Sequence, residues 1–206
     1  MNNSIKRLFL ISLFILITVS PLSAKENEFQ KLYGYENSFI CISIYDQNKK
    51  LLTEGASSPD SITLGHSIQY FSDVIIGLAV SYGLEVQINN LEQTIDKKKH
   101  KILSFIKFFD RTSPVLYSLL ISEKHLNITI KFFRINQTGS LEHYYTVSLE
   151  NAVIVGINSY SEKYNRREIE EVSFIYKKIT WTHEIEGTDS SAFWDPYDDN
   201  RSEERR

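Results

Sequence analysis

The chain has 206 residues, a length that indicates one domain or one domain with extensions. Its composition, 42% hydrophobic and 24% charged, excludes a wholly disordered or wholly membrane-embedded protein. The net charge of −3 gives no electrostatic reason to expect nucleic-acid binding. The 12 tyrosines and 12 phenylalanines suit pleated, half-buried surfaces and favour β structure.

Residues 1–24 have the pattern of a secretory signal peptide. Lys6 and Arg7 precede an apolar stretch from residue 8 to residue 19, and small residues follow up to Ala24. This order predicts cleavage between Ala24 and Lys25, and therefore a secreted or periplasmic protein, with residues 25–37 as an N-terminal extension. The apolar stretch is shorter than the roughly 18 residues of a membrane-spanning helix, although an uncleaved anchor is the alternative interpretation.

The first half of the remaining chain alternates between strand and turn patterns. Residues 39–45 predict a strand that contains the single cysteine, Cys41, and residues 46–50 predict a turn. Residues 54–61 predict a long loop, and β-type patches follow between residues 62 and 88. The basic run at residues 96–100 is interpreted as a solvated turn.

In the second half, one helical pattern interrupts a series of strands. A short helix that ends near Glu123 is predicted, with Thr112 or Ser113 as its cap, Pro114 in its first position and an apolar face formed by residues 115, 116, 119 and 120. The expected strands cover residues 101–109, 127–134, 142–149, 152–157 and 168–183, with a hairpin turn at 136–140. We therefore predict a mainly β domain over residues 38–188, an antiparallel barrel or sandwich with one flanking helix, and a flexible polar tail over residues 189–206.

The sequence offers no pattern for catalysis. Cys41 lies among isoleucines as a small core hydrophobe, and the five histidines are scattered without metal-ligand spacing. No glycine-rich phosphate loop or G-x-S-x-G motif is present. Glu170 and Glu171 would face opposite sides of a strand, so the cluster that they form with Glu168 is interpreted as a strand entrance. We expect no catalytic, cofactor-binding or metal-binding residues, with an unrecognised enzyme as the least favoured alternative.

Several segments resemble the Hcp family, which forms the inner tube of the bacterial type VI secretion system. The resemblance covers about residues 38–195 and is most specific from residue 113 to residue 188. The similar segments are residues 113–117 (SPVLY), 128–134 (ITIKFFR), 139–145 (GSLEHYY), 151–155 (NAVIV), 170–181 (EEVSFIYKKITW) and 183–188 (HEIEGT), with a weaker likeness around residues 53–62.

The resemblance implies a tube subunit without enzymatic activity that assembles into hexameric rings, and the rings stack into a tube that carries effectors. The implied partners are other copies of the chain and the spike, sheath and effector proteins of the secretion machine. The loop 55–61 becomes the candidate ring-stacking surface, with Gly55, Ala56, Ser57, Ser58, Asp60 and Ser61.

The predicted signal peptide departs from this family, whose members assemble in the cytoplasm without a cleavable signal. If the signal is not used, a cytoplasmic tube is expected. If it is used, the alternative is an exported, secreted or periplasmic binding protein that acts outside a tube.

Overall fold

The computed structural model describes residues 38–56, 62–64, 67–69, 73–88, 94–161 and 168–193, all within the unit Asn37–Arg206. The predicted signal peptide, residues 1–24, with its cleavage site at Ala24 and Lys25, and the extension 25–37 lie outside the described residues. The elements are β1 Ser38–Asp46, β2 Ile62–Leu64, β3 Ser67–Gln69, β4 Ile75–Ser81, β5 Leu84–Ile88, β6 Thr94–His100, β7 Leu103–Phe108, α2 Ser113–Ile121, β8 Leu126–Ile135, β9 Leu141–Ser161, β10 Glu168–Ile175, β11 Lys178–His183 and β12 Thr188–Phe193.

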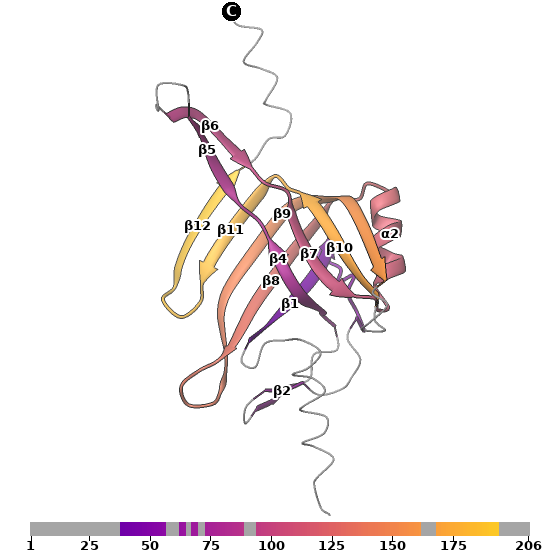
Figure 1. Ribbon diagram of the computed structural model, residues 1–206, viewed down its shortest axis with the longest axis vertical. Helices are drawn as coiled ribbons and strands as arrows, with labels where there is room; N and C mark the ends of the chain where they lie inside the picture. Colours follow the sequence, from indigo (N-terminus) through magenta and orange to yellow (C-terminus); the bar gives the residue numbers. More distant parts are fainter. Residues whose placement is uncertain are drawn as a thin grey trace, which may run out of the picture. The chain divides into compact units, whose positions relative to one another are not determined.

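Six of these strands close into an antiparallel barrel (Figure 1). The order is β10-β7-β4-β1-β8-β9, and β9 closes the circle because its second half pairs with β10. The first half of β9 pairs instead with β11, which continues the sheet outwards to β12. The prediction of an antiparallel β-barrel with one flanking helix is confirmed.

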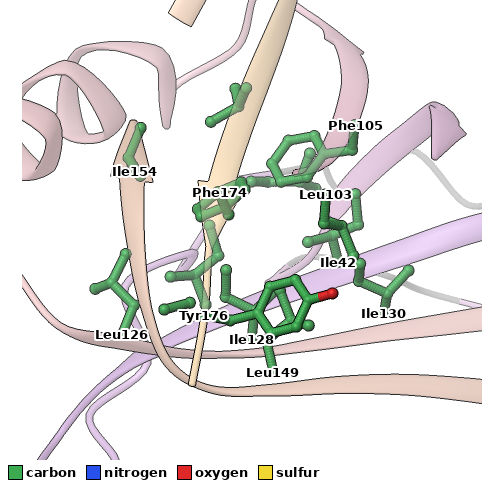
Figure 2. Packing of buried hydrophobic residues seen from close by; sticks show 14 of the residues in the cluster. Ile42, Leu103, Phe105, Leu126, Ile128, Ile130, Leu149, Ile154, Phe174 and Tyr176 are labelled. Atoms are coloured by element: carbon green, nitrogen blue, oxygen red, sulfur yellow. The ribbon is translucent and has the colours of Figure 1, made fainter. Parts of the chain in front are cut away.

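Alternation along the strands places one apolar row of each strand inside the barrel. On β10 the inward residues include Val172 and Phe174, and on the neighbouring β7 they include Leu103 and Phe105. The rings of Phe105 and Phe174 stack with their centroids 5.4 Å apart. Figure 2 shows Leu103, Phe105 and Phe174 packed against residues of β1, β8 and β9. Burial of this apolar surface is the main stabilising term of the fold.

Side-chain oxygens fix the two turns that local sequence predicts. Asp46 Oδ1 accepts hydrogen bonds from the amides of Asn48 and Lys50 after β1. Asn136 Oδ1 accepts in the same way from the amides of Thr138 and Ser140 between β8 and β9. Such Asx contacts need only neighbouring residues, so a sequence pattern is sufficient to predict them.

The predicted helix is confirmed as α2, but the side chains that it buries differ from the predicted set. Leu116 and Leu119 are buried, whereas Val115, which was predicted to lie on the buried face, is exposed. Glu123 has a left-handed φ of 48°, and the helix ends two residues before it.

Three predicted boundaries are wrong. The strands expected at 142–149 and 152–157 form the single strand β9, which continues through Asn151 at a φ of 55°. The strand expected at 168–183 is divided into β10 and β11, and the basic turn expected at 96–100 belongs to β6. The bounds of β9, β10 and β11 depend on pairing between strands, and the segment 96–100 is a strand because it pairs with the neighbouring β5, so in each case pairing decides against the pattern of single residues.

The polar tail expected from residue 189 begins inside a strand. β12 pairs with β11 along its whole length, from Thr188 opposite His183 to Phe193 opposite Lys178. Of its six residues, Ala192 alone is half-buried and the others are exposed, so no apolar alternation marks the strand. Backbone pairing and the Lys178 ammonium over the Phe193 ring, 5.6 Å from its centroid, hold it in place.

Candidate functional site

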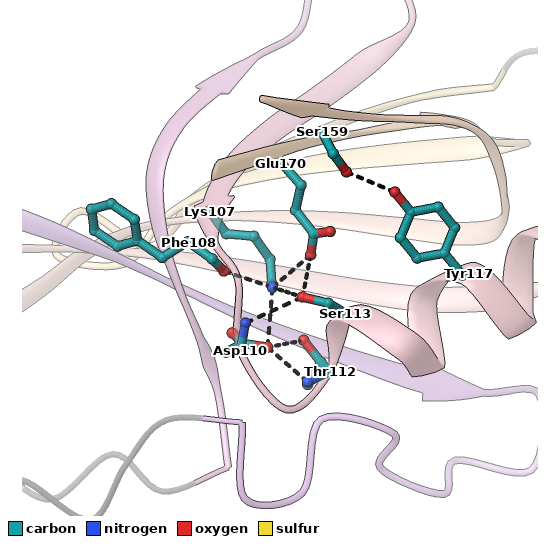
Figure 3. A network of polar contacts seen from close by, with 8 residues as sticks. All are labelled: Lys107, Phe108, Asp110, Thr112, Ser113, Tyr117, Ser159 and Glu170. Atoms are coloured by element: carbon teal, nitrogen blue, oxygen red, sulfur yellow. Dashed lines mark hydrogen bonds and ion pairs between the residues drawn. The ribbon is translucent and has the colours of Figure 1, made fainter. Parts of the chain in front are cut away.

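A buried ion pair closes one end of the barrel interior. Lys107 and Glu170 are cross-strand neighbours on β7 and β10, and both side chains are 0% exposed. Lys107 Nζ lies 2.7 Å from Glu170 Oε1 (Figure 3). Both residues continue the inward-facing rows of their strands beyond the apolar residues. The pair is therefore the last interior layer at this end of the barrel.

The loop that leads into α2 completes the network around this pair. Lys107 Nζ also donates to Ser113 Oγ at 3.1 Å and to the Phe108 carbonyl at 2.8 Å, and it lies 3.0 Å from Asp110 Oδ1. Ser113 Oγ donates in turn to Glu170 Oε1 at 2.7 Å. The Lys107 ammonium thus contacts four oxygens, which come from β7, β10, the loop at Asp110 and the first residue of α2, so the network ties these segments together.

The burial of this network argues against chemistry on a substrate. Neither charged group of the ion pair reaches solvent, and a general acid or base must reach the proton that it transfers. Glu170 Oε2 has no hydrogen-bond partner among the described residues. Glu171, one residue further, is half-buried on the other face of β10, as the alternation predicted.

Sequence reasoning missed the role of Glu170 and Lys107, although a signal was present. Each stands two residues from a buried aromatic or aliphatic side chain of the same strand, Val172 on β10 and Phe105 on β7. A charged residue that falls on the inward-facing side of a strand is buried, so it needs an oppositely charged partner. The identity of the partner, however, requires the pairing of β7 with β10, which are 63 residues apart at this contact.

The described histidines make contacts that are separate from one another. His100 is buried, and its Nδ1 lies 3.3 Å from the Tyr176 hydroxyl inside the barrel. His143 Nε2 lies 2.9 Å from Thr146 Oγ1, which itself donates to Glu184 Oε1. Burial lowers the pKa of His143, and the nearby Glu184 carboxylate partly opposes this effect.

The remaining described histidines have separate surroundings. His183 accepts from the Glu186 amide, His125 is exposed, and His66 lies outside the described residues. Within the part of the chain that the structure describes, no three His, Cys, Asp or Glu side chains gather closely enough to hold a metal ion.

Cys41 is a buried thiol, as predicted, but it lies on the same face of β1 as Ser43 and outside the apolar cluster of the barrel interior. It is 3% exposed, and burial raises its pKa to about 12, an effect that Lys131 on β8 partly offsets. We expect the native thiol to react with a thiol reagent at pH 8 more slowly than the unfolded chain, by a factor on the order of 10³, because the thiolate is the reactive form. Absorbance with an aromatic disulfide reagent, with and without denaturant, checks this. Equal rates in the two conditions would mean that the thiol is accessible.

The candidate ring-stacking loop begins with residues that anchor it to the barrel. Gly55 has a φ of 65°, and its amide donates to Asp73 Oδ1 at 2.9 Å. The Ala56 side chain is 4% exposed and belongs to the core, so it is not available for a contact between rings. Ser57, Ser58, Asp60 and Ser61 lie outside the described residues.

Substitution of Gly55 by alanine should destabilise the protein by roughly 1–2 kcal/mol, because an L-residue resists a left-handed conformation. A Cβ at Gly55 would lie 2.6 Å from one Arg111 guanidinium nitrogen, but that long side chain can move aside. Gly187→Ala is the matched control, since Gly187 has a φ of 66° and nothing within 4 Å of its added Cβ. Denaturant unfolding should give similar losses. A much larger loss for Gly55→Ala would mean that Arg111 is held in place.

Open strand edges remain outside the closed barrel. Among the described strands, β12 pairs only with β11, while β5 and β6 pair only with each other. Leu84 and Val86 of β5 are exposed, as is Phe193 of β12 at 76%. Unpaired edges of this kind are templates for pairing with another chain.

The outer face of the sheet beyond β1 carries a row of hydroxyl groups. Ser43, Thr129, Ser148, Thr180 and Ser191 follow one another in register across β1, β8, β9, β11 and β12. All five are half-buried or exposed, and on β1, β8, β9 and β11 the neighbouring residues of opposite parity pack into the core. The row itself is therefore polar and uncharged, with Lys131 and the Lys178–Glu150 ion pair beside it.

Within the described residues, no helix is long and apolar enough to span a membrane.

Comparisons of the sequence and of the structure with known proteins find relatives of the same kind. The family model described as "Type VI secretion system effector, Hcp" matches residues 66–183. The "Major exported protein" of Pseudomonas aeruginosa is 33% identical over 163 residues, which cover 74% of this chain and 93% of that protein. The crystal structure of an Hcp protein is similar with a TM-score of 0.66 and 28% identity, over 76% of this chain and 99% of that one. The secreted protein Hcp3 from Pseudomonas aeruginosa is similar with a TM-score of 0.61 and 33% identity, over the same shares.

Proposed function

Because this chain belongs to the Hcp family of type VI secretion proteins, we propose that it is a structural subunit, without enzymatic activity, that assembles into stacked hexameric rings and carries effectors. The observation that carries the proposal is the set of open edges beside a closed barrel. A ring of identical subunits needs two different patches that fit each other head to tail. The outer edge of β12 and the edges of the β5–β6 pair are distinct candidates for these patches.

The hydroxyl row supports the carriage of effectors. Hydroxyl groups donate and accept hydrogen bonds, so the row itself can contact the backbone groups of many polypeptides. We propose that this face lines the passage within the ring. The loop from Gly55 to Ser61 is proposed to contact the next ring through Gly55, Ser57, Ser58, Asp60 and Ser61, since the Ala56 side chain is buried. Spike, sheath and effector proteins are the proposed further partners.

The test is the solution mass of residues 25–206, with negative-stain images of the same sample. Uniform rings of about six subunits that stack at high concentration are expected. A folded monomer at high protein concentration would contradict the proposal.

A second candidate function follows from the N-terminal segment. The basic residues Lys6 and Arg7, the apolar stretch after them and Ala24 favour export as a single subunit, and the similar Pseudomonas aeruginosa protein is described as exported. In that case the chain is a secreted or periplasmic binding protein outside a tube. Mass spectrometry of the cellular and exported protein separates the two functions. A mature chain that begins at Lys25 and stays monomeric favours the second, and an intact N-terminus in rings favours the first.

A further inference from the structure

The helix α2 has a small buried surface. Leu116 and Leu119 are its buried apolar side chains and Leu120 is half-buried against the same core, while Tyr117 is exposed and Ile121 is 82% exposed. Its nine residues are fewer than the roughly 12–15 at which isolated helices become marginally stable. The position of α2 therefore depends on the contacts that join it to the barrel.

The strongest polar contacts lie at the first residue of the helix (Figure 3). Ser113 Oγ donates to Glu170 Oε1 at 2.7 Å and accepts from Lys107 Nζ at 3.1 Å. We call these three residues the clasp. The Tyr117 hydroxyl, 2.7 Å from Ser159 Oγ on β9, adds an exposed contact one turn later. The clasp is therefore the one buried polar link between α2 and the barrel in the described part of the chain.

The clasp is an incomplete network. Glu170 Oε2 has no hydrogen-bond partner among the described residues. Thr112, the residue before the helix, makes no capping bond because its hydroxyl donates to Asp110 Oδ1 at 2.6 Å. Buried ion pairs can often be replaced by apolar residues without loss of stability. Their effect can instead be to favour one conformation of the chain over others. In the clasp, the selected arrangement is the position of the helix start.

We propose that α2 is a lid over the barrel end formed by Lys107 and Glu170, and that it opens as a unit while the barrel stays folded. The clasp sets the closed position, and Lys107, Glu170 and Ser113 are positioning residues. The barrel does not need α2 for closure, because β9 and β10 pair directly along eight residues of each strand. Opening exposes Leu116, Leu119 and this barrel end. The closed and open states of the chain therefore present different surfaces to a partner. The inference does not depend on ring formation.

Hydrogen exchange followed by mass spectrometry tests the lid on the purified protein and on Lys107→Met/Glu170→Met. In the double variant, amides of α2 should lose protection by at least about tenfold, while amides of β1 and β8 keep theirs. Unchanged protection of α2, or an equal loss in α2 and the strands, would overturn the proposal.

Ser113→Ala keeps the test decisive if the double variant does not fold. It removes the hydroxyl that joins α2 to the ion pair, and a several-fold loss of protection confined to α2 is expected; no loss would overturn the proposal. The matched control is Lys101→Met, which breaks the exposed ion pair with Glu85 far from the clasp. This variant should leave the exchange of α2 unchanged, and a loss there would show that removal of any lysine loosens the helix.

Discussion

Replacing Lys107 by methionine alone should destabilise the barrel by roughly 3–5 kcal/mol, because the Glu170 carboxylate then stays buried without a counter-charge. Glu170 is 0% exposed, and of the described side chains only the Ser113 hydroxyl would still donate to it. Adding Glu170→Met to Lys107→Met should recover most of the lost stability, since neither charge of the pair then remains buried. Urea unfolding followed by circular dichroism, at low protein concentration, measures both free energies of unfolding.

The control for this prediction is an ion pair of similar length near the surface. Lys178 Nζ lies 2.6 Å from Glu150 Oε1, where the carboxylate side chain is 57% exposed. Lys178→Met should cost less than about 1 kcal/mol, because water solvates the partner that is left. Equal losses in Lys107→Met and Lys178→Met would mean that burial does not set the cost, and the role given to the Lys107–Glu170 pair would be wrong.

The sequence predicts those features of the fold that depend on near neighbours. The turns at Asp46 and Asn136 follow from side chains that bond amides two and four residues later. The helix follows from the spacing of apolar residues, which changes from every second residue to every third or fourth residue around Pro114. The fold class follows from the number and spacing of the predicted strands. The likeness of residues 113–188 to a known family adds the topology.

The remaining features depend on pairs of residues that are distant in sequence. The partner of Glu170 is known only once β7 lies beside β10. β12 has no apolar alternation, so pairing with β11 alone makes it a strand, and residue patterns by themselves assign it to a tail. The candidate stacking loop rests on resemblance, which does not reveal that the Ala56 side chain enters the core.

Removal of β12 tests whether this missed strand carries the assembly. A chain of residues 25–187 should remain folded but form no rings. The barrel stays closed because β9 and β10 pair without β12, and Ile179 of β11 stays in the core. The proposed ring joint, however, loses the edge that pairs with the next subunit. Light scattering after gel filtration should give a fall from about six subunits to one.

The matched control is a chain of residues 25–193, which keeps β12 and lacks only residues 194–206. It should assemble like residues 25–206, because the edge of β12 is intact in both. Rings from the chain that ends at residue 187 would place the joint elsewhere, with the β5–β6 pair as the next edge to alter. Loss of rings in both truncated chains would assign the joint to residues 194–206, and an unfolded 25–187 chain would show that β12 stabilises the sheet. The comparison thus separates a strand that holds the subunit together from a strand that holds subunits to each other.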